Sequence, residues 1–160
     1  SILSPHLRGF LISLEKRLKQ VTEKAASVHL NPEIAFEEAL EDRTPYIQQG
    51  TSGNALVTIT QGRATVARAL GAGHMPLAHL YRGDFFGEVP FLEMGHEPYS
   101  AAVYTDETLQ TEPVDTDQLQ HEYDRLSTLF KNIIENVANR ISATTMVACE
   151  LQQKGSETTN

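Results

Sequence analysis

The sequence predicts a mainly β fold with a long helix at each end. Two stripes of apolar residues at helical spacing, one near each terminus, indicate the helices. Between them, short segments of alternating apolar and polar residues, separated by Gly, Pro and Asp, indicate strands in a closed or double-sheet structure rather than a parallel α/β fold. The chain has 160 residues, which is enough for one domain with its own core.

The first helix is expected within residues 1–31. Its apolar positions recur at alternating steps of four and three, with charged residues between them, as in an amphipathic helix of about six turns. The helix should end at Asn31-Pro32, because a residue before proline is disfavoured in the helical conformation. The apolar positions are Leu7, Leu11, Leu14, Leu18, Val21, Ala25 and Val28.

Residues 32–125 are expected to form the strand region. Apolar and polar residues alternate over 56–60, and the pattern resumes after Gln61-Gly62, a dipeptide typical of a hairpin turn. Further strands are expected at 64–69, 75–81, 99–104 and 108–114.

Helical spacing returns after this region. Asp115 is followed three residues later by Gln118, which resembles a capping box at the start of a short helix. A second apolar stripe then predicts a long helix within 126–153, and the polar residues 154–160 are expected to form a disordered tail. The stripe consists of Phe130, Ile134, Val137, Ile141, Thr144, Ala148 and Leu151.

Composition excludes several classes of partner. The chain has 13 basic and 21 acidic residues and a net charge of −8, so it repels a phosphate backbone and is not expected to bind nucleic acid by itself. Cys149 is the single cysteine, which excludes an internal disulfide and fits a reducing, cytoplasmic compartment. No apolar run approaches the ~20 residues needed to span a bilayer, so no membrane partner is expected.

Three kinds of motif occur in a fixed order along the strand region. Glycine turns at Gly50, Gly53 and Gly62 are followed by Phe-Gly-Glu at 86–88 and then by Ser-Ala-Ala-Val at 100–103. Together they resemble the cyclic nucleotide-binding domain family, over about two-thirds of the chain. The resemblance implies a double-stranded β-helix, or jelly-roll-like barrel, that acts as a regulatory module. It also implies a small ligand, either a cyclic nucleotide or another anionic or nucleoside-like molecule.

In that family, the turn at Phe-Gly-Glu is the phosphate-binding cassette. Backbone N–H groups at the start of such a turn form an anion site. The resemblance implies that Glu88 accepts a hydrogen bond from the ribose 2′-hydroxyl, while the neighbouring amides meet the cyclic phosphate. The ligand-binding residues it implies are Phe86, Gly87, Glu88, Val89, Tyr99, Ser100 and Ala101.

The cassette departs from the family pattern at two positions, and both concern the phosphate. Tyr99 stands where the family has an arginine, and Pro90, which has no N–H group, stands where the family has a small residue. Charge-assisted hydrogen bonds contribute about 1.5–3 kcal/mol each, so their loss moves a micromolar site towards millimolar. We therefore expect a degenerate cassette, altered or vestigial, with Arg82 and His96 as candidate replacement cations.

The two apolar stripes also predict a homodimer. They hold more apolar positions than one small barrel face needs, and the family's long C-terminal helix commonly forms a dimer seam. Charged residues at Ile134 and Ile141 are then expected to give a monomer. The alternative is that each stripe packs on its own domain.

Two further interpretations compete with a sensory module. One is a purely structural oligomerisation domain without a ligand. The other is a cupin-like metalloprotein, but the odd separation of His74 and His79 places their rings on opposite faces of a strand, so no metal site is expected. No Gly-x-Ser-x-Gly elbow exists, and Cys149 has no histidine nearby in sequence, so no catalytic residues and no enzymatic activity are expected.

Overall fold

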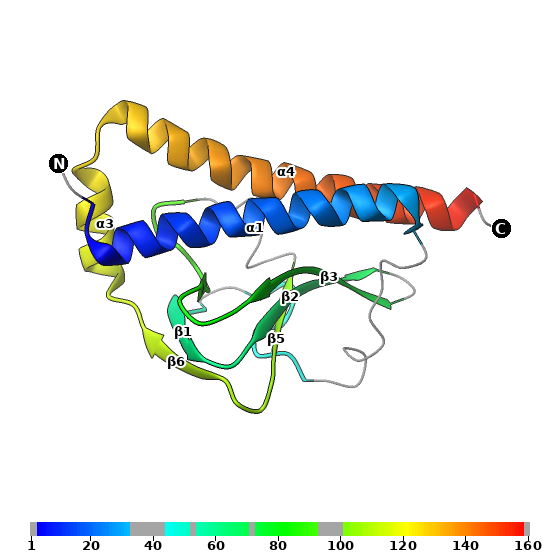
Figure 1. The fold of residues 1–160 in the computed structure, drawn as a ribbon, viewed down its shortest axis with the longest axis horizontal. Coiled ribbons are helices and arrows are strands. Elements are labelled where there is room, and N and C mark those ends of the chain that lie inside the picture. The colour runs from blue at the N-terminus through cyan, green and yellow to red at the C-terminus, as the bar shows by residue number, and fades with distance from the viewer. Residues whose placement is uncertain (1–2, 33–43, 52–53, 71–72, 93–100, 159–160) are drawn as a thin grey trace.

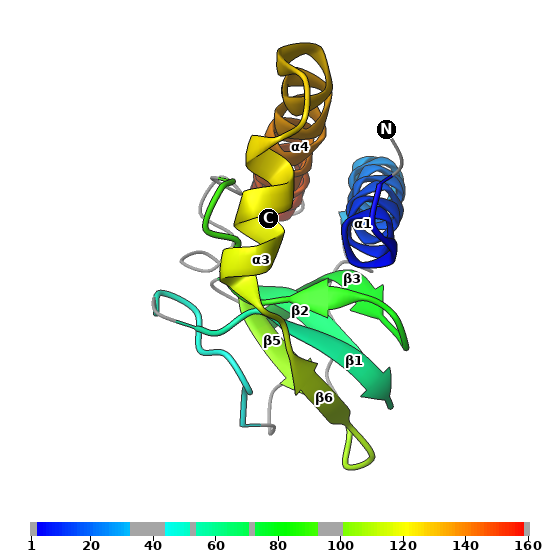
Figure 2. The same ribbon diagram turned by 90° about the vertical axis from the view of Figure 1, so that its left-hand side faces the viewer.

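The computed structural model describes residues 3–32, 44–51, 54–70, 73–92 and 101–158. Antiparallel strands lie on one side of the molecule, and two long helices run side by side across them (Figures 1 and 2). The elements are α1 (Pro5–Leu30), β1 (Val57–Gln61), β2 (Ala64–Leu70), β3 (Gly73–Leu80), β4 (Phe85–Phe86), β5 (Ala102–Thr105), β6 (Gln110–Pro113), α3 (Thr116–Asp124) and α4 (Thr128–Thr158). The predicted fold class, mainly β with a long helix at each end, is confirmed.

The described strands form two three-stranded sheets, in the orders β4-β1-β6 and β3-β2-β5. Neighbouring strands pair antiparallel throughout. The predicted turn at Gln61-Gly62 joins β1 to β2 and carries the chain from one sheet to the other. Gly62 has a φ of +88°, and a side chain there would come within 2.7 Å of the Leu109 Cα atom, so the turn requires glycine.

Helix α1 ends at Leu30, directly before the Asn31-Pro32 pair that was expected to end it. The Ser4 side chain accepts a hydrogen bond from the Leu7 N–H group, and Pro5 occupies the first turn, where its missing N–H costs nothing. At the other end, the Asn31 N–H group donates to the Ser27 carbonyl oxygen. Helix α3 is capped as expected, because the Asp115 carboxylate accepts from the Gln118 N–H group at 3.0 Å.

Helices α1 and α4 pack along each other and share one core with both sheets (Figure 2). Ile134 and Ile141 of α4 are 2% and 1% exposed within the single chain. The prediction that these two residues form a dimer seam is therefore wrong, because α1 already provides the apolar surface that covers them. The stripe packs on its own domain, as the alternative interpretation held.

The expected disordered tail is helical as far as Thr158, so that part of the prediction is wrong. Gly155 of α4 lies so close to Pro32 that a side chain there would overlap the proline ring. This contact joins the end of α4 to Pro32, just after α1. It stabilises the last turns of α4, which the polar sequence predicted to be disordered. None of the helices among the described residues is long and apolar enough to cross a membrane.

Candidate functional site

The Phe-Gly-Glu element forms a tight turn at the end of β4. Gly87 has a φ of +111°, and a side chain there would come within 2.7 Å of the Ala55 carbonyl carbon and 2.8 Å of the Leu56 Cα atom. The next residue, Glu88, donates its N–H group to the Asn54 carbonyl oxygen at 3.0 Å. The turn therefore rests directly on the backbone that leads into β1, and only glycine fits at its centre.

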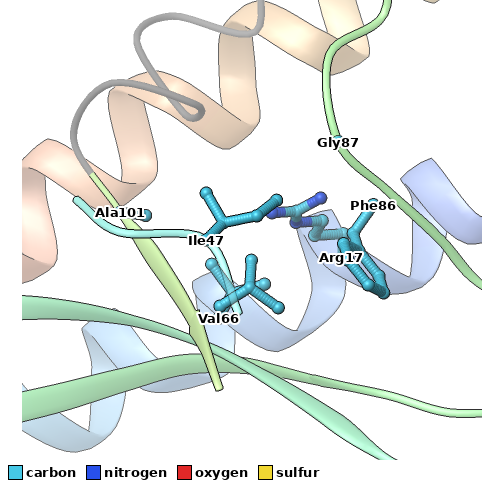
Figure 3. Close-up of a pocket in the computed structure, with 7 residues that line it drawn as sticks. Arg17, Ile47, Val66, Phe86, Gly87 and Ala101 are labelled. Atoms are coloured by element: carbon cyan, nitrogen blue, oxygen red, sulfur yellow. The ribbon is translucent and has the colours of Figure 1, made fainter. Parts of the chain in front are cut away.

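Three of the expected ligand-binding residues meet at one small cavity (Figure 3). Phe86 and Gly87 come from the turn and Ala101 directly precedes β5, and an arginine of α1 lies beside Phe86 in the same lining. The cavity measures about 20 Å³, which leaves room for about one water molecule. Its lining residues are Arg17, Ile47, Val66, Phe86, Gly87, Ala101 and Val103.

A second cavity, of about 10 Å³, shares Arg17, Phe86 and Gly87 with the first. Val89, another expected ligand-binding residue, lines this second cavity. The remaining lining residues belong to α1, to β4 and to the residue directly before β1: Phe10, Ser13, Leu14, Phe85 and Leu56. The cassette turn thus faces α1 through two adjoining cavities.

Arg17 is the charged residue that sequence reasoning missed. Its side chain is 7% exposed and extends between Ile47 and Phe86 (Figure 3). A signal was present in the sequence, since Arg17 lies three residues after Leu14 and four before Val21, and thus on the apolar face of the helix. Among the described residues that line the two cavities, Arg17 is the only one with a charged side chain.

Polar contacts hold α1 against the strands that carry the cassette. The Phe85 N–H group donates to the Ser13 Oγ atom at 3.2 Å. Lys16 pairs with the buried Asp84 carboxylate at 3.8 Å. Gln20 accepts from the His79 N–H group at 2.6 Å and donates to the His79 carbonyl oxygen at 2.8 Å. These helix positions lie on one face, so α1 follows the edge of β3 and the start of the cassette.

A second set of contacts joins the segment after the cassette to three helices. The Phe91 ring stacks on Tyr123 of α3 with a centroid distance of 4.2 Å and meets Phe10 of α1 edge-on at 5.9 Å. The Tyr123 hydroxyl donates to a Glu135 carboxylate oxygen of α4 at 3.0 Å. Burial, together with the Glu135 carboxylate, raises the pKa of Tyr123 to about 12. The segment that follows the cassette turn is therefore packed against α1 and α3, and Tyr123 connects it to α4.

The Tyr123 hydroxyl gives a testable pH dependence. Because the folded state raises its pKa from 10.0 to about 12, its contribution to stability is complete below pH 10 and is lost as the pH rises towards 12. We expect Tyr123→Phe to lower the free energy of unfolding by about 1 kcal/mol at pH 7. The difference from the unsubstituted chain should shrink in urea titrations between pH 10 and 12. A difference that stays constant across this range would contradict the assignment.

The family model described as the cyclic nucleotide-binding domain matches residues 37–123. This match spans more than half of the chain. The chain belongs to the cyclic nucleotide-binding domain family. The resemblance based on the glycine turns, Phe-Gly-Glu and Ser-Ala-Ala-Val is thereby confirmed, together with a β structure of jelly-roll type between two long helices.

Solved structures of the EAL enzyme Bd1971 have a similar fold. Its cAMP-bound form is 18% identical, covers 72% of this chain and 30% of its own, and has a TM-score of 0.56. Its cGMP-bound form is 17% identical, covers 62% of this chain and 26% of its own, and has a TM-score of 0.52. This chain thus spans less than a third of that enzyme. A comparison with curated proteins gives no significant match.

The other residues that the sequence suggested for ligand binding either line neither cavity or lie outside the described residues. Glu88 is half-buried and engaged in interactions within the protein, and it lines neither cavity. Tyr99, Ser100 and His96 lie outside the described residues. Arg82 is exposed and also lines neither cavity. Of the two cations that sequence reasoning considered, the one that can be placed does not reach the cavities.

The histidines considered as metal ligands have other neighbours. The His79 Nδ1 atom lies 3.0 Å from the Thr65 Oγ1 atom, and the His74 ring meets Tyr104 edge-on at 5.8 Å. Within the described ranges, no three His, Cys, Asp or Glu side chains lie close enough together to hold a metal ion.

Proposed function

We propose that this chain is a regulatory module that binds a small anionic or nucleoside-like ligand at the cassette, with a cyclic nucleotide as the first candidate. One observation supports this most strongly: Phe86, Gly87 and Ala101 of the cassette region line a single cavity together with a buried arginine. The similar fold of Bd1971, whose structures are described as cAMP-bound and cGMP-bound, also favours a cyclic nucleotide. We propose a sensory role rather than a catalytic one.

The phosphate site of this module is proposed to be altered. Tyr99 and Pro90 remove the arginine and one N–H group that the family uses. The cavity as it stands holds about 20 Å³, so the ligand can enter only if side chains or α1 shift. Both features predict that cyclic nucleotides bind more weakly than to members with the complete cassette.

Calorimetric titration with cyclic AMP and cyclic GMP tests this proposal. We expect affinities weaker than about micromolar for the unsubstituted chain, and at least a tenfold gain for Tyr99→Arg, since one charge-assisted pair is worth about 1.5–3 kcal/mol. Tyr99→Phe is the matched control, because it changes the same side chain without adding charge. Micromolar binding by the unsubstituted chain, with no gain in Tyr99→Arg, would contradict an altered phosphate site.

A structural oligomerisation domain without a ligand is the second candidate function. The small volume of the cavity favours it, because about 20 Å³ is too little space for a nucleotide. The same titration separates the two functions: a ligand-free structural domain would release no heat with either cyclic nucleotide, including in the Tyr99→Arg variant.

We further propose that the chain forms a homodimer through the outer face of α4 rather than through its buried stripe. Leu129, Ile133 and Val147 are 72%, 52% and 47% exposed. Leu129 and Val147 are separated by five full turns and point in one direction, with Ile133 one turn from Leu129. Large apolar side chains exposed along one helix face are suited to pairing with a second copy.

A further inference from the structure

We propose that Arg17 of α1 supplies the positive charge that meets the anionic group of the ligand. This inference rests on the proposed function and concerns the same site. In the family, that charge comes from an arginine at the position of Tyr99, within the cassette itself. Here the cassette residues Phe86 and Gly87 share both cavities with Arg17, so the cation comes from a different element of the fold.

The surroundings of Arg17 suit an anion. Its side chain is more than nine-tenths buried, and Ile47, Val66 and Val103 form apolar walls around the cavity. Such walls lower the local dielectric constant and strengthen the attraction between a guanidinium and a phosphate. A guanidinium stays charged at any accessible pH and offers a planar fork of donors that matches two phosphate oxygens.

Arg82 and Lys16, two other cationic residues near the cassette, are less well placed than Arg17 to contact a ligand in the cavities. Arg82 is exposed, and Lys16 is 59% exposed and paired with Asp84. Neither of them lines a cavity beside the cassette turn. Arg17 already interacts with another group of the protein, so an incoming anion would share or replace that partner.

The position of Arg17 on α1 links recognition to helix movement. The cavity has room for about one water molecule, so an anion can reach the guanidinium only if the side chain or the helix moves. Helix α1 is held to β3 and β4 through Ser13, Lys16 and Gln20, and it packs along α4. A ligand that binds Arg17 therefore selects a different conformation of this side chain or a different placement of α1, because it contacts the two states unequally.

Calorimetry with two probes tests this assignment. Cyclic AMP carries the phosphate and adenosine does not, so the charge of Arg17 should matter for the first alone. We expect Arg17→Met to weaken cyclic AMP binding by about tenfold or more and to leave adenosine binding unchanged. Arg17→Lys keeps the charge but loses the planar fork of donors, so its affinity for cyclic AMP should fall by a smaller factor than that of Arg17→Met. Arg8→Met, at an exposed position of the same helix, should change neither.

Each other result would overturn the assignment. Equal losses for cyclic AMP and adenosine in Arg17→Met would show a structural role, and tighter binding of both would show that Arg17 blocks the site. If a melting scan shows that Arg17→Met does not fold, the cyclic AMP affinity of Arg17→Lys is the test instead. An affinity equal to that of the unsubstituted chain would refute the proposal. Binding of both probes that is insensitive to Arg17 leaves the proposed function intact, whereas no binding of either by the unsubstituted chain contradicts the function itself.

Discussion

Replacing Ile141 with aspartate is expected to unfold the chain rather than to separate two folded copies. Ile141 is 1% exposed in the core that α4 shares with α1. The substitution removes buried apolar surface and leaves an unpaired carboxylate in its place, at a cost of at least about 4 kcal/mol. That is a large fraction of the free energy of unfolding of a typical domain, which is about 5–15 kcal/mol. Circular dichroism should show loss of helix signal or a strongly lowered midpoint of urea unfolding.

Ile133→Asp is the matched control on the same helix. Ile133 is 52% exposed, so the aspartate remains solvated and the free energy of unfolding should change by no more than about 0.5 kcal/mol. If the proposed dimer forms through the outer face of α4, analytical ultracentrifugation should show a dimer for the unsubstituted chain and a folded monomer for this variant. A folded Ile141→Asp chain at half the original mass would instead place the seam at the buried stripe and contradict the packing described above.

Gly87→Ala is expected to have the second large effect. The positive φ of Gly87 strains any residue with a side chain by about 1–3 kcal/mol. The added methyl group would also overlap the backbone of Ala55 and Leu56, which cannot move without disturbing the strand that follows. Together these effects should lower the free energy of unfolding by at least about 3 kcal/mol in urea titrations.

Gly83→Ala separates the cost of backbone strain from the cost of steric overlap. Gly83 has a similar φ of +91°, but no atom lies within 4 Å of the position that a side chain would take. Only the backbone strain applies there, so the loss should be about 1–2 kcal/mol. Equal losses at both glycines would show that the backbone beneath Gly87 yields, and that the turn does not depend on this close contact.

Local sequence signals were sufficient to predict most of the fold. The apolar stripes fixed the faces of α1 and α4, Asn31-Pro32 fixed the end of α1, and Asp115 fixed the start of α3. These features depend on spacing and capping within one segment. The partner of α4 could not be predicted in the same way, because an apolar stripe is compatible with a second copy or with another helix of the same chain.

The candidate site was predictable only in part, for a related reason. The positions of Phe86, Gly87 and Ala101 follow from motifs in the strand region, and the cavity brings them together. Arg17 is about seventy residues away in sequence, in a helix outside those motifs. Its place on the apolar face of α1 indicated burial, but only the packing of α1 on the cassette shows what it faces.

Two-dimensional NMR of the backbone amides during a cyclic AMP titration tests the central claim most directly. If the cassette cavity is the ligand site, signals from 86–89 and Ala101 should shift, and signals along α1 around Arg17 should shift with them at the same ligand concentrations. Shifts confined to surfaces remote from the cassette, or a spectrum that stays unchanged at millimolar cyclic AMP, would contradict a ligand site between this turn and α1.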